Sequence, residues 1–564
     1  RLGLRVALFE PLKMIGGMGA AGNLALHDGG AISGLGTEFM LRAGKYYNLT
    51  SGVLQPESFV SVKVYNDMLA SANVSHVRLD CRLTGATREV AGASSKVGSI
   101  SVVCEKSPVT ANVFIDASYD GEIMLAVGDV AYTAGRESIR TYNETLAGAR
   151  KPSLDGTSAP FHVNALKDDG TLLKYVANLS SLPPAGEADD ALMAFQHRMC
   201  ISGAEDRVPW PKPDGYNPDD FLLMQRSLEV GGLVFSKMPP NAMKGPGAKR
   251  QKYTLCCGIS VAASDQPMLN QGWANATWER KQEIIADHTY FELGSLYYLA
   301  NDPKVPESTR DLFSKYGLCR DEFPEFGHIP PQLYIRISNR MVSDYVMTQN
   351  NIINPRHKDD SIAVGDWSFD EHMTGKYAVP VGGGKYEIQL EGNFWPKCGW
   401  YDVPYKIMVP KRGTGTNLLV PVAFSASAVA YSSARIEGMF MSTGTAAGVA
   451  AKQLVDAEVT AVQEVNVTKV QLILKETFQQ AIHGDPVPST APEYYNVTHG
   501  GISSWNGHYK KSLSPDSSSL SYVSASNSSH SLYPYLGVWR LAINGKEIFY
   551  EAGTASSLPP LSGW

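Results

Sequence analysis

The sequence has no long uncharged apolar run, and this absence excludes an ordinary membrane-spanning helix. Of its 564 residues, 43% are hydrophobic and 19% are charged, as in many globular proteins. A spanning helix needs about 18 or more consecutive apolar residues. The longest candidate, residues 418–430, is shorter and carries two serines. We therefore expect no membrane span. The length of the chain suits two or three domains, each with a core of its own.

Basic clusters are equally scarce. The formal net charge is -6, and the short basic groups at 249–252 and 411–412 are the most concentrated ones. A nucleic-acid-binding surface needs Lys and Arg gathered along one face or one helix. We therefore expect no nucleic-acid partner.

Cysteines are few, and none has the C-x-x-C spacing of zinc or thioredoxin-like chemistry. We expect no metal site. The seven cysteines are scattered, and Cys256 and Cys257 are adjacent. Buried or unpaired thiols are the expected state, and a bridge between Cys81 and Cys104 on neighbouring strands is the alternative.

Sequons for N-glycosylation are, by contrast, more frequent than chance would give. Eight asparagines begin an N-x-[ST] triplet: Asn48, Asn73, Asn143, Asn178, Asn275, Asn466, Asn496 and Asn527. This excess predicts a secreted or secretory-pathway glycoprotein. The chain begins at Arg1 and not at Met, so we expect a signal peptide to lie outside it.

The first 120 residues alternate between predicted strands and helices. Residues 4–10 predict a short buried strand that ends at Glu10, and a glycine-rich turn follows at 16–22. Residues 57–74 have helical periodicity, and 76–104 predict paired strands with a turn near 92–95. Residues 113–116 predict another strand that ends in an acid.

The rest of the chain divides into three segments that differ in composition and in predicted secondary structure. Residues 140–400 are mixed, with proline-rich loops and predicted helices at 277–300 and 306–316. Residues 417–421 predict a strand, and 437–456 predict a helix of small residues. After 480 the composition shifts to Ser, Tyr, Trp and Asn, which indicates a linker at 481–493 and a small β module at 494–564.

Glu10 occupies a position that carries chemistry in dinucleotide-binding folds. There, an acid at the end of the second strand accepts hydrogen bonds from the adenosine ribose. The glycine fingerprint normally precedes this acid by about 20 residues, so we expect the first strand to be missing from this chain. The alternative is that Glu10 simply ends a strand.

Several ordered segments resemble one family. Phe9-Glu10-Pro11 and Ile15-Gly16-Gly17-Met18 are similar to the second-strand region of the FAD-dependent oxidoreductases, within the glutathione-reductase-like FAD/NAD(P)-binding superfamily. Further matches follow in order at 114–122, 135–138, 142–148, 195–200, 207–216, 334–336, 370–372, 405–422 and 435–448. The resemblance covers roughly residues 1–480.

The resemblance implies an α/β fold and FAD as the cofactor. A Rossmann-like FAD domain would comprise 1–139 and 401–480, and an α+β substrate domain would be inserted at 140–400. The cofactor-binding residues that the resemblance implies are Glu10, Pro11, Gly16, Gly17, Met18, Arg82, Leu83, Asp116, Ala117, Arg136, Gly444, Ala446 and Ala447. Plain helix packing is the alternative role for the small residues at 446–451.

The resemblance also implies two catalytic residues. His372 matches a family histidine and is the expected base, and Arg336 matches a family arginine that would hold the substrate. A core histidine and a structural ion pair are the alternatives, and His27 is a weaker candidate. The sequence departs from the family pattern at Ala428, where a histidine is usual, and at Gly438, where proline is usual. If the lost histidine is catalytic in relatives, this chain uses another base, acts on a different substrate or does not turn over.

We therefore predict an FAD-dependent oxidoreductase that removes hydride from a carbon donor such as a sugar, alcohol or polyol. The electron acceptor is left open. A flavin-dependent hydroxylase is one alternative, and a secreted glycan-binding or structural protein with a degenerate fold is another. The C-terminal segment resembles small β modules that begin W-N-G-x-Y and end P-P-x-x-G-W, and its aromatic residues predict either glycan binding or a core.

Overall fold

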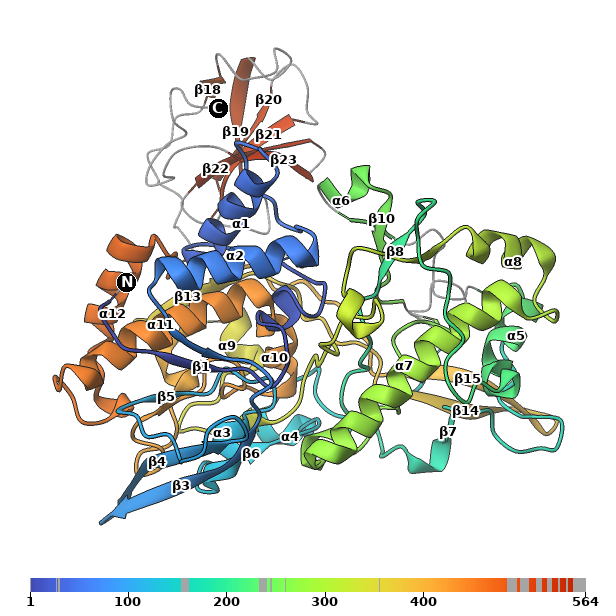
Figure 1. Cartoon of the computed structure of the whole chain (residues 1–564), viewed down its shortest axis with the longest axis horizontal. Coiled ribbons are helices and arrows are strands. Elements are labelled where there is room, and N and C mark those ends of the chain that lie inside the picture. The colour runs from blue at the N-terminus through green and yellow to red at the C-terminus, as the bar shows by residue number, and fades with distance from the viewer. Residues whose placement is uncertain are drawn as a thin grey trace.

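The computed structural model describes most of the chain. The residues outside its description are 1, 27, 29, 30, 154–161, 233–240, 244, 245, 259, 355, 484–493, 498–506, 514–519, 525–529, 536, 537, 544, 545 and 551–564. His27 and most of the expected linker thus lie outside the described residues. The described part is a mixture of helices and sheets arranged in two lobes, with a group of strands from the C-terminal region beside them (Figure 1).

The first lobe contains the two parallel strand pairs. Strand β1 (Ala7–Phe9) pairs with β2 (His76–Arg78), and β5 (Phe114–Ile115) pairs with β17 (Leu418–Leu419). The second pair brings residues near 115 against residues near 419, so two segments that are far apart in the sequence lie side by side. The strands predicted at 4–10, 113–116 and 417–421 are confirmed, although each is shorter than predicted.

Helices cover these strands. The helix of small residues is α11 (Glu437–Val455), and its alanines Ala446, Ala447 and Ala450 pack in a core with Leu419 and Ile362. Small side chains let a helix approach its neighbours closely, which explains why the predicted 437–456 helix is buried here. The other helices of this lobe are α1 (Leu35–Tyr46), α2 (Ser58–Ser71), α3 (Glu122–Val127), α4 (Ile139–Tyr142), α9 (Gln349–Ile353), α10 (Ala428–Ala434) and α12 (Val467–Phe478).

The predicted paired strands at 76–104 form a hairpin. Strand β3 (Leu83–Ala91) pairs antiparallel with β4 (Ser94–Val102). Just outside the hairpin, a disulfide joins Cys81 to Cys104. The bridge that the sequence left as an alternative is therefore present.

The second lobe lies around the long helix α7 (Trp278–Asn301), which confirms the helix predicted at 277–300. Its four-stranded antiparallel sheet has the order β11 (Gly317–Leu318), β8 (Cys200–Ser202), β10 (Lys252–Thr254), β9 (Asn241–Ala242). A second sheet contains β15 (Lys385–Glu391), β14 (Gly375–Gly382) and β7 (Ala177–Asn178). Helices α5 (Leu222–Glu229), α6 (Pro246–Lys249) and α8 (Glu307–Ser314) complete the lobe.

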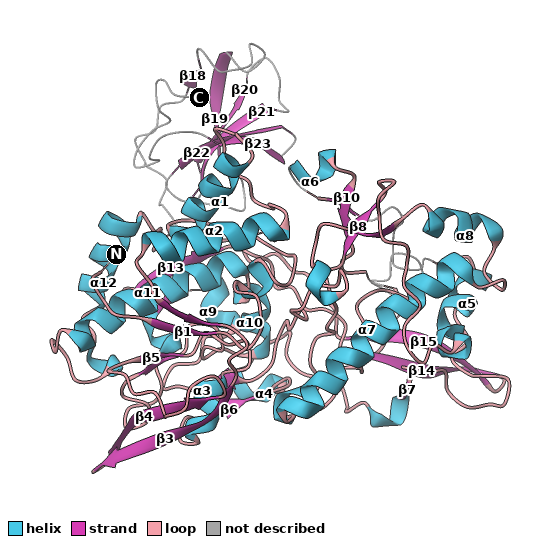
Figure 2. Ribbon diagram, viewed as in Figure 1, coloured by secondary structure: helices cyan, strands magenta, loops and turns pink. Residues whose placement is uncertain are grey.

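The segment 140–400 is not confined to this second lobe. Strand β13 (Ser361–Gly365) pairs with β16 (Tyr401–Pro404), and Ile362 packs in the core of α11 and α12. Likewise β12 (Arg340–Met341) pairs with β6 (Tyr132–Thr133). Figure 2 shows that long loops run through the middle of the molecule between the two lobes.

The expectation of unpaired thiols was wrong for six of the seven cysteines. Disulfides join Cys81–Cys104, Cys200–Cys319 and Cys256–Cys257, and Cys398 is the free, buried one. Cys200 and Cys319 are 119 residues apart in sequence, and the packing of β8 beside β11 brings them together. Sequence spacing cannot reveal such a pair.

The C-terminal region, where the sequence predicted a small β module, forms a six-stranded antiparallel sheet. Its strands follow one another in chain order: β18 (Tyr494–Val497), β19 (Gly507–Leu513), β20 (Leu520–Ser524), β21 (His530–Tyr535), β22 (Val538–Ile543) and β23 (Lys546–Tyr550). Among all the residues that the structure describes, no helix is long and apolar enough to cross a bilayer.

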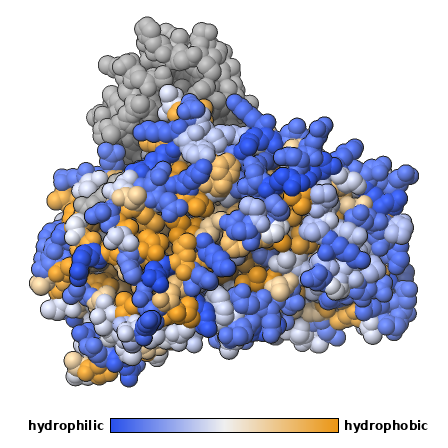
Figure 3. All heavy atoms as spheres, viewed as in Figure 1, coloured by the Kyte–Doolittle hydropathy of each residue, from blue (hydrophilic) through white to orange (hydrophobic). Residues whose placement is uncertain are grey.

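Surface composition differs between the lobes. In the view of Figure 3, hydrophobic residues gather over the lobe that holds β1 and α11, whereas hydrophilic residues dominate over the lobe that holds α7. Val6 and Ile115, beside β1 and in β5, are 49% and 38% exposed.

Candidate active site

Three loops supply most of the residues that line a cavity of about 750 Å³, and Asp28, Arg198 and Tyr334 come from other segments. One loop follows β10 and carries Cys256 and Cys257, the second joins β13 to β14 and carries His372, and the third joins β15 to β16 and carries Trp395. Loops on a rigid scaffold are where binding residues gather. The cavity is large enough for a small-molecule ligand.

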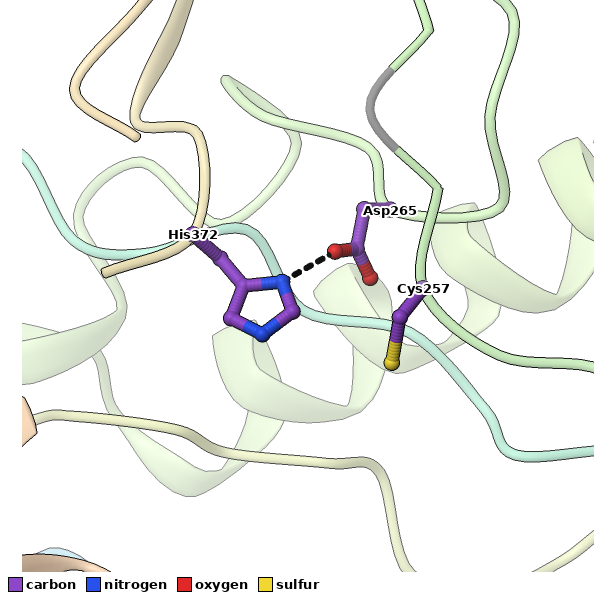
Figure 4. A group of neighbouring side chains, drawn as sticks. All are labelled: Cys257, Asp265 and His372. Carbon is purple, nitrogen blue, oxygen red and sulfur yellow. Dashed lines mark hydrogen bonds and ion pairs between the residues drawn. The ribbon is translucent and has the colours of Figure 1, made fainter. Parts of the chain in front are cut away.

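His372 lies in this cavity and is held by a carboxylate. Its Nδ1 is 2.6 Å from Oδ2 of Asp265, and its Nε2 is 3.4 Å from Oδ1 of Asp370. Figure 4 shows the His372 imidazole and the Cys257 sulfur on either side of Asp265. When Nδ1–H donates to Asp265, Nε2 is the nitrogen that can accept a proton from a ligand.

Asp265 is fully buried and anionic. Burial alone would raise its pKa, but the charges of Arg336 and His372 outweigh this effect and lower the pKa below its ordinary value. Nη2 of Arg336 donates to Oδ1 of Asp265 at 2.8 Å, and Nη1 donates to the Ala194 carbonyl. The expected substrate arginine is thus paired with the carboxylate that orients the expected base, in the ion pair that the sequence left as an alternative.

Asp370 organises the opposite side of the imidazole. Its Oδ1 accepts from Nε1 of Trp395 at 2.6 Å, and its Oδ2 accepts from Nε1 of Trp367 at 3.1 Å. Burial acts to raise the pKa of Asp370, but the effects of His372, Arg435 and the hydrogen bond from Trp367 together outweigh burial. The pKa of Asp370 is therefore lowered. Asp370 therefore fixes two tryptophans at the cavity while it remains charged.

Arg198 brings a buried cation to the cavity. It is 1% exposed, and burial lowers its pKa. Its nearest acid is Asp28, at 3.8 Å from Nη1, and among the described residues neither Nε nor Nη2 has a hydrogen-bond partner. A buried guanidinium with orphaned donors is costly unless a ligand supplies acceptors. The site therefore suits a ligand with oxygen atoms that can accept hydrogen bonds from Arg198.

The glycine segment after β1 makes a tight backbone cradle. Gly16 has φ 98°, and a Cβ there would lie 2.8 Å from Ala20 Cβ and from the Tyr65 ring. Gly17 also has positive φ, and a Cβ there would lie 2.8 Å from the Tyr119 hydroxyl. Only glycine adopts this path without a clash.

Tyr119 ties the cradle to the start of α11. The Met18 N–H donates to the Tyr119 hydroxyl at 2.8 Å, and that hydroxyl donates to Oε1 of Glu437 at 2.9 Å. Burial raises the pKa of Glu437 to about 8. The predicted glycine segment and the predicted closing helix are therefore neighbours, as one cofactor site requires.

Three other expected cofactor residues have polar groups that form hydrogen bonds within the protein. Both Asp116 oxygens accept hydrogen bonds from Ser118 or Met124, so this side chain closes the turn before α3. Arg136 is held between Asp189 and Glu391. Oε1 of Glu10 accepts from the Leu12 N–H at 2.9 Å, and burial raises its pKa to about 7.

The remaining residues expected to bind the cofactor differ in how they pack. Arg82 stacks over Trp278 at 5.6 Å, and Leu83 pairs with Val102 in the hairpin. Ala446 and Ala447 are buried in the core, whereas a Cβ built on Gly444 would meet no atom within 4 Å. Pro11 is partly buried and Ala117 is exposed.

Comparison with protein families identifies the chain. A family model for FAD dependent oxidoreductase matches residues 1–474. The chain belongs to this family. It is an FAD-dependent oxidoreductase, and FAD is its cofactor. Searches of curated proteins and of solved structures each found no match.

The residues present fit the cofactor that the family uses. The Gly16–Gly17 cradle leaves no room for side chains, and such glycines let backbone approach a dinucleotide. The amides at the N-terminus of α11 lie beside this cradle through Tyr119 and favour negative charge. These two elements would hold FAD, which supplies the two-electron acceptor when it is bound.

Sequence reasoning missed several residues of the cavity. Asp265, Arg198 and the tryptophans Trp367 and Trp395 were not singled out, because each comes from an irregular segment without periodicity. Asp265 is 107 residues from His372 in the chain. Its signal in the sequence was only a lone acid in a loop, which is far too common to be informative.

Proposed function

We propose that the enzyme oxidises a polyhydroxylated small molecule, a sugar or polyol, and that His372 is the base. The observation that carries this proposal is the pair of His372 and Asp265 at a cavity that also holds Trp367 and Trp395. Carboxylates accept hydrogen bonds from hydroxyl groups, and aromatic rings offer flat apolar faces to a sugar ring. Family membership favours this enzyme over a glycan-binding protein without activity.

The chain's own residues divide the work of the reaction. Nε2 of His372 accepts the proton of a donor hydroxyl, and Asp265 stabilises the positive charge that develops on the imidazole. Arg336 fixes Asp265 by the 2.8 Å contact and is a positioning residue. Arg198 directs its unpartnered donors to an oxygen of the ligand. FAD, held by the Gly16–Gly17 segment and the start of α11, would supply the acceptor for the hydride on the carbon that carries this hydroxyl.

The test is an anaerobic titration of the FAD-loaded protein. Sugars and polyols are added singly, and the flavin absorbance is followed. Bleaching by a member of this panel in the wild type, and loss of bleaching in His372→Gln with flavin still bound, supports the proposal. Bleaching that requires a reduced nicotinamide favours the flavin-dependent hydroxylase instead. The matched control is His162→Gln, because His162 is an exposed histidine that also pairs with an acid, Glu387.

We further propose a discontinuous FAD domain of residues 1–139 and 401–480 in the glutathione-reductase-like superfamily. The parallel pairing of β5 with β17 supports it, because this pairing joins the two segments. The inserted substrate domain would be the lobe around α7. Limited proteolysis that releases the α7 lobe while the two outer segments stay associated would support this division.

The protein is also proposed to pass through the secretory pathway. The structure describes the burial of six sequon asparagines, and each of them is exposed: Asn48, Asn73, Asn143, Asn178, Asn275 and Asn466. Disulfides such as Cys200–Cys319 persist in oxidising compartments. Treatment of the native protein with an N-glycosidase should lower its apparent mass. Unmodified sequon peptides at all six sites would count against the proposal.

A further inference from the structure

Asp402 is a buried carboxylate on which two histidines converge. Its side chain is 0% exposed, and its Oδ2 lies 2.6 Å from Nδ1 of His483 and 3.4 Å from Nδ1 of His357. The Lys358 N–H donates to the same oxygen at 3.0 Å. A carboxylate oxygen has about two lone pairs, so these three nitrogens cannot all donate to it with good geometry. A cation between the side chains would bind this oxygen and both imidazoles at once.

Three elements position these side chains. Asp402 lies in β16, His357 precedes β13, which pairs with β16, and His483 follows α12. The Asp402 N–H donates to the Arg356 carbonyl at 2.8 Å, and Ile482, the residue before His483, is buried in the core of α11 and α12. The three residues are thus held by packed backbone, as a preformed metal site requires.

The spacing of the three residues suits a tetrahedral ion. One ligand atom from each residue can be chosen so that all three atoms lie within 4.8 Å of one another. Two ligands of tetrahedral zinc lie roughly 3.4 Å apart, so the His357 contact fits and the His483 imidazole has to move outward by less than about 1 Å. The side chains of His357 and His483 are 55% and 36% exposed, which leaves room for this movement and for water as the fourth ligand.

The types of ligand select among cations. Imidazole nitrogen suits zinc, copper and nickel, whereas Ca²⁺ and Mg²⁺ prefer oxygen ligands throughout. Lys358 adds a positive charge near Asp402, although its Nζ donates to the carbonyls of Asn351 and Arg356 at 2.9 and 3.3 Å. We therefore expect binding at micromolar zinc, weaker than at a closed site with four protein ligands.

A second group of possible ligands lies in the cavity and is less suitable. Among the described residues, Cys257, Asp265 and His372 form the other close set of three. Cys257 is bonded to Cys256, so it offers no thiolate, and the guanidinium of Arg336 already neutralises Asp265. The set around Asp402 is free of both obstacles.

We propose that His357, Asp402 and His483 bind one Zn²⁺ outside the cavity. The inference does not rest on the proposed function, since it concerns residues that take no part in it. The expectation of no metal site rested on the spacing of cysteines, which says nothing of histidine and carboxylate ligands brought together by folding.

The place of this site gives the ion a structural role. The loop that joins β15 to β16 supplies Trp395 to the cavity and ends just before Asp402. Trp400, at the end of this loop, packs against the His357 imidazole with 4.8 Å between the ring centroids. Zn²⁺ would therefore join the end of a loop that lines the cavity to the segment after α12.

The experiment counts zinc in the full chain loaded with FAD and free of any histidine tag. The protein is dialysed first against a chelator and then against micromolar free Zn²⁺, and bound metal is measured by elemental mass spectrometry. We expect the wild type to bind one Zn²⁺ more than His357→Gln or His483→Gln, with at least about tenfold weaker binding in each variant. An excess of Ca²⁺ or Mg²⁺ should not displace this ion.

His162→Gln is the matched control. His162 lies 2.6 Å from Glu387, the same separation as between His483 and Asp402, but it belongs to no set of three ligands among the described residues. Its substitution should leave the zinc count unchanged. Equal loss of zinc in this control would show that isolated surface histidines bind the metal, and would overturn the inference.

Thermal unfolding supplies a second readout. An ion that binds the folded chain raises the unfolding temperature, so Zn²⁺ should raise it in the wild type and in His162→Gln but not in His357→Gln or His483→Gln. The flavin spectrum of each variant shows whether it has folded. A wild type that binds no zinc, or zinc binding that survives either substitution at the site, overturns the inference and leaves the proposed function standing.

Discussion

His372 and Asp265 form a short contact, 2.6 Å between Nδ1 and Oδ2, and the same carboxylate binds Arg336 through its other oxygen. One buried acid therefore fixes both residues that the sequence had marked as catalytic. This arrangement explains how an expected base and an expected substrate arginine can act together although only His372 lines the cavity.

Removal of the Asp265 charge tests this arrangement. In Asp265→Asn, the imidazole loses the anion that orients it and stabilises its charged form. We expect the rate of flavin reduction by the donor to fall about 10²–10⁴-fold, the usual contribution of a positioned base, while flavin absorbance is retained. Stopped-flow absorbance measures this rate. An unchanged rate in a variant that still binds flavin would exclude the proposed role of the pair.

Arg198 should contribute to ligand binding at the expense of stability. Its Nε and Nη2 have no partner among the described residues, and its nearest acid is 3.8 Å away. We expect the free energy of unfolding of Arg198→Met to equal that of the wild type or to exceed it by about 1–3 kcal/mol. The reason is that the substitution removes a poorly compensated buried charge.

The same variant should lose the stabilisation that a bound ligand gives. Thermal unfolding with and without the donor identified by bleaching compares the two proteins. Arg226→Met is a matched control, because Arg226 pairs with an acid, Asp168, outside the cavity. A ligand-dependent shift of the same size in Arg198→Met and in the control would contradict the assignment.

Glu437 should make stability depend on pH. Burial raises its pKa from 4.5 to about 8 in the folded state. The folded protein therefore binds more protons than the unfolded chain between these values, and stability from this group is lost as pH rises from about 4.5 to about 8. In Glu437→Gln this loss is absent, while an oxygen remains to accept from Tyr119.

The comparison uses urea unfolding of both proteins at several pH values. The wild type should lose stability relative to Glu437→Gln by on the order of 1–3 kcal/mol across this window, and the difference should level off above pH 8. A constant difference from pH 5 to pH 9 would show that Glu437 does not titrate as the structure indicates.

Local patterns sufficed for the elements that position the site. The apolar run before Glu10, the small residues of 437–456 and the helical period of 277–300 each depend on neighbours in sequence, and β1, α11 and α7 appear where they predict. The lengths of the parallel strands were overestimated, because apolar character extends beyond the residues that pair.

The assembled site was predictable only in part. Resemblance indicated His372 and Arg336, but the carboxylate that joins them, Asp265, comes from a loop whose path is set by tertiary packing. The disulfide between Cys200 and Cys319 was missed for the same reason. Cys200 meets Cys319 only because β8 lies beside β11, and pairing across 119 residues leaves no local pattern.

Two glycines offer a matched test of the cofactor cradle. Gly16→Ala places a Cβ 2.8 Å from Ala20 Cβ and the Tyr65 ring at a positive φ, so we expect about 1–3 kcal/mol of destabilisation and loss of FAD. At Gly444 a Cβ meets nothing, and alanine should stabilise α11 by about 0.5–1 kcal/mol.

The two variants thus separate stability from cofactor contact. If FAD passes beside α11 as the family resemblance implies, Gly444→Ala fills space that the cofactor needs. Its affinity for FAD, measured by flavin fluorescence, should then fall at least tenfold although the protein is more stable. Normal affinity in Gly444→Ala, together with loss of FAD in Gly16→Ala, would restrict the cofactor contact to the glycine segment and remove Gly444 from it.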